Sequence, residues 1–113
     1  MTRRRLQNRR ASLSFNFRCG SLNYVATISH FPDGTLAEVF LSNGKAGSDS
    51  DIAARDSAVV VSIALQFGVP LDVLRHALMR DAQGRPSGPL GTALDFVAKQ
   101  ELEVASERGS DDA

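Results

Sequence analysis

The fold is decided by residues 31–74, which read FPDGTLAEVFLSNGKAGSDSDIAARDSAVVVSIALQFGVPLDVL. Pro32-Asp33-Gly34 is typical of a tight turn, because proline presets φ and glycine accepts a positive φ. The alternation over residues 35–41 predicts a half-buried strand. A glycine-rich loop follows, and the helical period from Ser48 or Ser50 to about Phe67 predicts a long capped helix. Residues 31–74 therefore predict a strand, a loop, a helix and the start of another helix.

The same stretch indicates which side chains are buried. On the strand, Ala37, Val39 and Leu41 are expected to face the core, which leaves Glu38 and Phe40 outside. On the helix, one apolar stripe is expected to pack and a second set to widen it; the stripe is Ile52, Val59, Val60, Ile63, Ala64 and Phe67, and the second set is Ala54, Ala58, Val61 and Leu65. A stripe this broad indicates a central helix that packs against more than the sheet.

The flanking sequence completes the expected architecture. Residues 12–18 and 22–30 alternate as strands around a hairpin turn at Gly20-Ser21. A second helix is expected from Pro70, a loop over residues 81–89, and a last helix from about Leu90. Strands grouped before helices predict an α+β fold of two layers, a three-stranded antiparallel sheet followed by two or three helices packed on one face. The open sheet edges could pair with a second chain.

Charge divides the chain into three parts. Its 113 residues have a formal net charge of zero, yet the start is rich in arginine and the end is rich in acids. We expect a basic flexible arm over residues 1–11, one domain over 12–102 and an acidic flexible tail over 103–113. The length fits a single core.

Several classes of site are not expected. Cys19 is the only cysteine, so a disulfide within the chain is impossible and a reducing cytoplasm is the expected compartment. No run is long and apolar enough for a membrane span. One cysteine and two histidines do not give the spacing of a zinc site. No nucleophile and base are recognisable, so we expect no catalytic residue, no metal and no cofactor.

Two segments are candidates for binding. The Gly44–Ser48 loop lies between a strand and a helix start, as phosphate loops do. Val39 stands where that motif needs its first glycine, so a turn plus helix cap is the favoured interpretation. The second candidate is the arm, whose arginines could contact nucleic-acid phosphates or an acidic protein surface; they are Arg3, Arg4, Arg5, Arg9 and Arg10.

Several separated motifs carry a family resemblance. They are Arg4-Arg5-Leu6 with Arg9-Arg10, Asp33-Gly34, LAEVFL at 36–41, Lys45 with Gly47, SIALQFGVPL at 62–71, and Gly88 with Leu94 and Asp95. With these motifs, residues 3–98 resemble the TSCPD-type domain. That domain is found near the C-terminus of adenosylcobalamin-dependent ribonucleoside-diphosphate reductases and as small standalone proteins. The T-S-C-P-D string itself is absent, and so are the redox cysteines of the reductase.

The resemblance implies a non-catalytic accessory or interaction domain related to the ribonucleotide reductase system. Its implied partner is a second copy or a reductase-type protein. Radical reduction needs cysteines and a cofactor that Cys19 alone does not supply, so the chain is not expected to be an enzyme by itself. The alternative is a small nucleotide-sensing or nucleic-acid-binding domain. If a ligand site exists, the candidate residues are Glu38, Lys45, Ser48 and Gln66.

Overall fold

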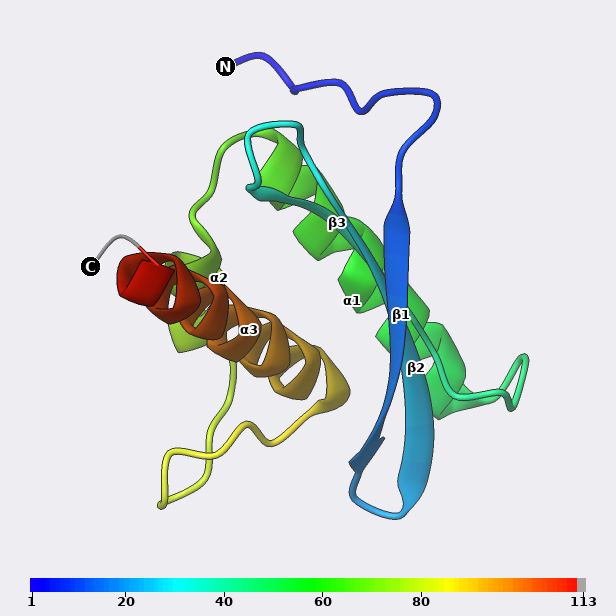
Figure 1. The fold of residues 1–113 in the computed structure, drawn as a ribbon. Helices are drawn as coiled ribbons and strands as arrows, with labels where there is room; N and C mark the ends of the chain where they lie inside the picture. Colours follow the sequence, from blue (N-terminus) through cyan, green and yellow to red (C-terminus); the bar gives the residue numbers. More distant parts are fainter. Residues whose placement is uncertain (112–113) are drawn as a thin grey trace.

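Three strands precede three helices. The computed structural model describes the backbone of residues 1–111 and the side chains of residues 1–106. The strands are β1 (Ser12–Cys19), β2 (Leu22–His30) and β3 (Leu36–Ser42); the helices are α1 (Asp49–Gln66), α2 (Leu71–Ala77) and α3 (Pro89–Asp111). The strands form one antiparallel sheet in the order β1-β2-β3 (Figure 1). The α+β class and the three-stranded antiparallel sheet are confirmed.

Two tight turns fix the register of the sheet. Cys19 pairs with Leu22, so the first hairpin has a two-residue loop in which Gly20 has a φ of 61°. In the second turn, the Oδ1 atom of Asp33 accepts hydrogen bonds from the backbone N–H and the hydroxyl of Thr35. These local bonds are the reason that the Pro-Asp-Gly pattern makes a turn in this position.

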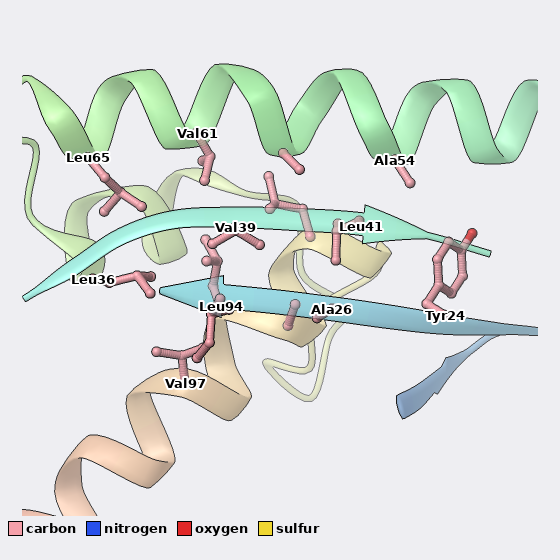
Figure 2. Packing of buried hydrophobic residues seen from close by; sticks show 14 residues of the cluster. Tyr24, Ala26, Leu36, Val39, Leu41, Ala54, Val61, Leu65, Leu94 and Val97 are labelled. Atoms are coloured by element: carbon pink, nitrogen blue, oxygen red, sulfur yellow. The ribbon is translucent and has the colours of Figure 1, made fainter. Parts of the chain in front are cut away.

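The core lies between one face of the sheet and the helices. Strand residues such as Ala26, Ile28 and Val39 are almost fully buried there, together with Leu94 and Val97 of α3 (Figure 2). Buried residues of α1 belong to the same cluster. Both long helices therefore cover the same sheet face, as the sequence predicts.

The expectation for the packed face of α1 is wrong. The residues that pack are the second set, including Ala54, Ala58 and Val61. Most of the first stripe is exposed instead; its exposed members are Ile52, Val59, Val60, Ile63 and Phe67. Small alanines let the helix approach the sheet closely, and polar residues on the same face bind the backbone of β3. A prediction from hydrophobicity alone places the larger side chains in the core, because it takes no account of close approach or of hydrogen bonds to β3.

The arm contacts the domain, and most of the tail is helical. The structure lays the arm against the domain, through contacts described below, and α3 continues through residues 103–111. The mobility expected for residues 1–11 and 103–113 stays a prediction, and residues 112 and 113 lie outside the described part. Among the described residues, no helix is both long enough and apolar enough to cross a lipid bilayer.

Candidate functional site

Polar side chains of α1 cover the outer edge of β3. The hydroxyl of Ser62 accepts a hydrogen bond from the N–H of Val39 (2.9 Å) and donates one to its carbonyl (3.0 Å). The Nε2 atom of Gln66 donates to the carbonyl of Ala37 at 3.1 Å. Edge strands expose unpaired backbone groups that invite pairing with other chains. Here α1 satisfies these groups, so Ser62 and Gln66 act in the scaffold.

Replacing Ser62 with alanine is expected to lower the free energy of unfolding by about 1–2 kcal/mol. The substitution leaves both backbone groups of Val39 buried without a hydrogen bond, and each such group is costly. Urea unfolding measures the loss. Ser57→Ala is the matched control, because the Ser57 hydroxyl bonds only to the carbonyl of Ala54 within the same helix, and a change within about 0.5 kcal/mol is expected. Equal losses in the two variants would contradict this role of Ser62.

The Gly44–Ser48 loop forms a turn and a helix cap. The N–H of Lys45 donates to Oδ1 of Asn43, and the hydroxyl of Ser48 accepts from the N–H of Asp51 as the N-cap of α1. The buried carboxylate of Asp51 accepts from the N–H of Asn43 at 3.0 Å and from Arg55 at 2.8 Å. These bonds, the one from Asn43 first, hold the pKa of Asp51 below its usual value. The backbone N–H groups of Lys45 and Asp51, which an anion in this loop would need as donors, therefore already bind acceptors within the chain.

Glu38 is buried, although it was expected to lie outside. Its side chain does point to the sheet face opposite the helices, but Arg10 of the arm lies over it there. The Oε1 atom accepts from the Ser29 hydroxyl at 2.6 Å and from Nε of Arg10 at 2.7 Å. Burial by itself would raise the pKa of Glu38, but the bonds from Arg10 and Ser29 outweigh it and lower the pKa. The carboxylate is therefore ionised and already paired.

Three of the five arm arginines bind within the chain. Nε of Arg3 donates to Oε1 of Gln66 at 2.7 Å, and Arg10 binds Glu38 as above. The guanidinium of Arg4 pairs with Asp33 at 2.9 Å and lies 3.9 Å from the ring centre of Phe31. Hydrogen bonds from Thr35, and then from Arg4, lower the pKa of Asp33 to about 2.

The other two arm arginines, Arg5 and Arg9, are exposed, and among the described residues their side chains have no hydrogen-bond or ion-pair partner. They are the arm residues whose charges stay available for a nucleic acid or an acidic protein. Binding by the arm stays a prediction.

The structure does not bring the four candidate ligand residues together. Lys45 and Ser48 lie at the start of α1 and Gln66 at its end, about 27 Å away for an 18-residue helix. Glu38 points to the other face of the sheet. Over the residues that the structure describes, His, Cys, Asp and Glu do not gather in threes as a metal site requires. Ligand binding by these residues stays a prediction.

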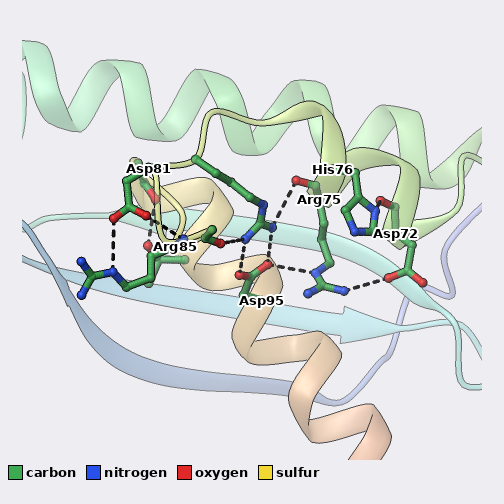
Figure 3. Close-up of polar contacts among 10 residues, drawn as sticks. Asp72, Arg75, His76, Asp81, Arg85 and Asp95 are labelled. Atoms are coloured by element: carbon green, nitrogen blue, oxygen red, sulfur yellow. Dashed lines mark hydrogen bonds and ion pairs between the residues drawn. The ribbon is translucent and has the colours of Figure 1, made fainter.

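A further polar cluster, which the sequence did not indicate, surrounds Asp95. Asp95 of α3 accepts hydrogen bonds from Nε of Arg75 at 2.9 Å and from both terminal nitrogens of Arg80, at 2.7 and 2.8 Å (Figure 3). These bonds, with Arg80 as the larger cause, lower the pKa of Asp95 to about 2. Arg80 also donates to the carbonyls of Arg75 and Gly84. The cluster joins α2, the following loop and α3.

The large apolar side chains of α1 that lie outside the core share one side of that helix. Ile52, Val59, Val60, Ile63 and Phe67 follow helical spacing and are 36% to 67% exposed. We call them the α1 outer surface. Asp56 lies among them by the same spacing. Exposed apolar patches of this kind mark contact sites in soluble proteins.

Comparison with known families places this chain in one of them. The family model described as the TSCPD domain matches residues 2–100, which is nearly the whole chain. The chain belongs to the TSCPD-domain family. The resemblance seen in the sequence is thereby confirmed, and the motifs quoted above lie within the matched segment.

The relatives of this TSCPD domain are much longer proteins. It is 36% identical over 70 residues to a vitamin B12-dependent ribonucleotide reductase of Streptantibioticus cattleyicolor and to one of Streptomyces clavuligerus. It is 33% identical over 72 residues to one of Rhodopirellula baltica. These matches cover 62%, 62% and 64% of this chain but 12%, 7% and 7% of the relatives. No solved structure matches this chain significantly.

Proposed function

We propose that this TSCPD domain is a non-catalytic interaction domain of the B12-dependent ribonucleotide reductase system, and that its α1 outer surface docks on a reductase chain. The observation that carries the proposal is the row of exposed apolar side chains on the 18-residue helix α1. Burying such a row removes apolar area from water, which is the main driving force of association.

The state of the carboxylates supports the non-catalytic part. A general acid or base works best with a pKa near the operating pH. Asp51, Glu38 and Asp95 each bind an arginine, and the pKa of each lies below its usual value. Such groups hold no exchangeable proton near neutrality. Their hydrogen bonds join segments of the chain, which is the work of a scaffold.

Two observations favour a reductase chain over a second copy as the occupant. The relatives contain this domain within much longer reductases, so the remainder of such a protein adjoins it there. In addition, Asp56 lies within the α1 outer surface. Two copies that met through this surface would bury two carboxylates of the same sign without a cation, which is costly. A reductase surface that is apolar and carries one lysine or arginine avoids that cost.

Val60→Asp is expected to weaken binding of the domain to a B12-dependent reductase at least tenfold. Val60 is the most exposed member of the surface, at 67%, so the substitution puts a charge into the contact without touching the core. Val73→Asp is the matched control, because Val73 is also exposed but lies on α2; its binding is expected to change less than twofold. Biolayer interferometry with the purified reductase gives both dissociation constants, and thermal melts confirm that the variants fold.

The same experiment separates the competing functions. Equal binding by both variants would overturn the docking proposal. A dimer of the free domain that Val60→Asp dissociates would assign the surface to a second copy. Affinity for nucleic acid that falls steeply with salt and depends on Arg5 and Arg9 would assign the arm to that function instead, because phosphate contacts release counterions. Stabilisation by a nucleotide that is lost in Lys45→Ala would assign the Gly44–Ser48 loop.

A further inference from the structure

A second feature has no role in the docking proposal. A cleft of about 420 Å³ lies between α1 and the start of α3. Its walls are mainly apolar and include Ala53 and Ala54 of α1, Leu78 and Met79 of the loop, and Leu90 of α3. None of the residues that line it carries a charge. A cleft of this volume lies in the range of small-molecule sites, and its lining suits an apolar body.

Tyr24 places a polar group in this apolar cleft. The residue is only 5% exposed, and its hydroxyl points toward α1 (Figure 2). Among the described residues the hydroxyl has no hydrogen-bond partner, and Tyr24 lines the cleft. The oxygen is not sealed from solvent, because the buried side-chain atom without a partner among these residues is Nε of Arg80. The hydroxyl is therefore a donor that a molecule entering the cleft can reach.

The start of α3 supplies two more donors at the same place. Pro89 is the first residue of α3, and the N–H groups of Leu90 and Gly91 precede the first hydrogen bond of the helix, which Thr92 makes to Gly88. Both residues line the cleft. The first turn of α3 contains no acidic residue that could satisfy these amides or balance the positive end of the helix dipole.

We propose that this cleft binds an apolar molecule that carries a single carboxylate. The carboxylate accepts hydrogen bonds from the amides of Leu90 and Gly91 and from the hydroxyl of Tyr24, while the apolar body packs on Ala53 and Met79. Without lysine or arginine in the lining, a ligand with several charges, such as a nucleotide, would be desolvated without a counter-charge. One carboxylate at a helix start is the charge that this site balances.

An NMR titration of the full ¹⁵N-labelled chain with octanoate tests the proposal. Octan-1-ol is the uncharged control ligand of the same chain length. Saturable shifts of the Leu90 and Gly91 amides are expected with octanoate, and binding of octan-1-ol is expected to be at least tenfold weaker. Tyr24→Phe keeps the ring in the core and removes only the hydroxyl. It is expected to weaken octanoate about tenfold, the effect of one hydrogen bond to a charged group.

A blocking variant and a control make the result decisive. Ala53→Phe fills the cleft from an exposed position of α1 and is expected to abolish binding, whereas Val59→Phe adds the same bulk on the same helix outside the cleft and is expected to leave it unchanged. Equal affinity for octanoate and octan-1-ol, or unchanged binding in Tyr24→Phe, would overturn the proposal.

Peptides ending in leucine identify the source of the carboxylate. If the free-acid peptide binds at least tenfold more tightly than octanoate, and its C-terminal amide does not, the natural ligand is the end of a polypeptide. If octanoate binds as tightly as the peptide or more tightly, the ligand is a free small acid. None of these measurements contains a reductase, so failure here and failure of the docking proposal are independent results.

Discussion

Asp95→Asn is expected to lower the free energy of unfolding by about 2–3 kcal/mol at pH 7. The carboxylate is 26% exposed and binds Arg75 and Arg80, which are equally sheltered. Asparagine keeps the shape but removes the charge, and it leaves two part-buried guanidinium groups without a counter-ion, which is among the costlier kinds of substitution. The Nε atom of Arg80 is already buried without a hydrogen bond, so Arg80 depends on Asp95 all the more.

The effect of Asp95→Asn depends on pH. Because the folded pKa of about 2 lies below the ordinary value near 3.9, the carboxylate stabilises the fold fully above pH ~4. That contribution, about 2 kcal/mol for a shift of this size, is lost as the pH falls from ~4 to ~2. Urea unfolding at pH 7, 4 and 2.5 should therefore show the wild-type protein losing more stability than the variant, with the two values converging in acid.

Asp72→Asn is the matched control for Asp95. Asp72 binds the same Arg75 at 2.9 Å but is 72% exposed, and exposed ion pairs contribute little. We expect a loss within about 0.5 kcal/mol. If the two variants were equally stable, or if the gap between Asp95→Asn and the wild type did not close in acid, the cluster would not be the link between α2 and α3 that the structure indicates.

The parts of the fold that the sequence predicts are those with a local cause. Alternation places the strands, Gly20 and Pro32-Asp33-Gly34 set the turns, and Ser48 caps α1 where the helical period begins. Each of these signals lies within a few residues of its effect. The separated motifs carry the family resemblance as well, and the match of the TSCPD model over residues 2–100 confirms that resemblance.

What the sequence misses depends on partners far along the chain. α1 has two apolar sides, and periodicity does not tell which one packs; Ser62 and Gln66 decide it by binding β3 residues 23 and 29 positions away. Asp95 looks isolated until α2 brings Arg75 beside it from 20 positions away. The sequence does not reveal the cleft for the same reason, because Tyr24 and the start of α3 line one cleft only after folding.

Glu38→Ala is expected to lower the free energy of unfolding by about 2–3 kcal/mol, because, like Asp95→Asn, it removes the partner of an arginine. The carboxylate is 10% exposed, and its loss leaves the buried hydroxyl of Ser29 and the guanidinium of Arg10 without their acceptor. Glu103→Ala is the control, since Glu103 is an exposed acid on α3, and a change within about 0.5 kcal/mol is expected. Urea unfolding at pH 7 measures both.

The sign of the Glu38 effect distinguishes a scaffold role from a ligand role. Residues that serve binding are commonly held at a cost to stability, so their removal tends to stabilise a protein. A gain in stability for Glu38→Ala would thus favour the ligand role predicted from the sequence. A loss that shrinks when Arg10 is already alanine would show that the two side chains act as a pair, because substitutions of contacting residues are not additive. In that case the arm is part of the folded domain, and the open face of the sheet is closed at one end by the chain itself.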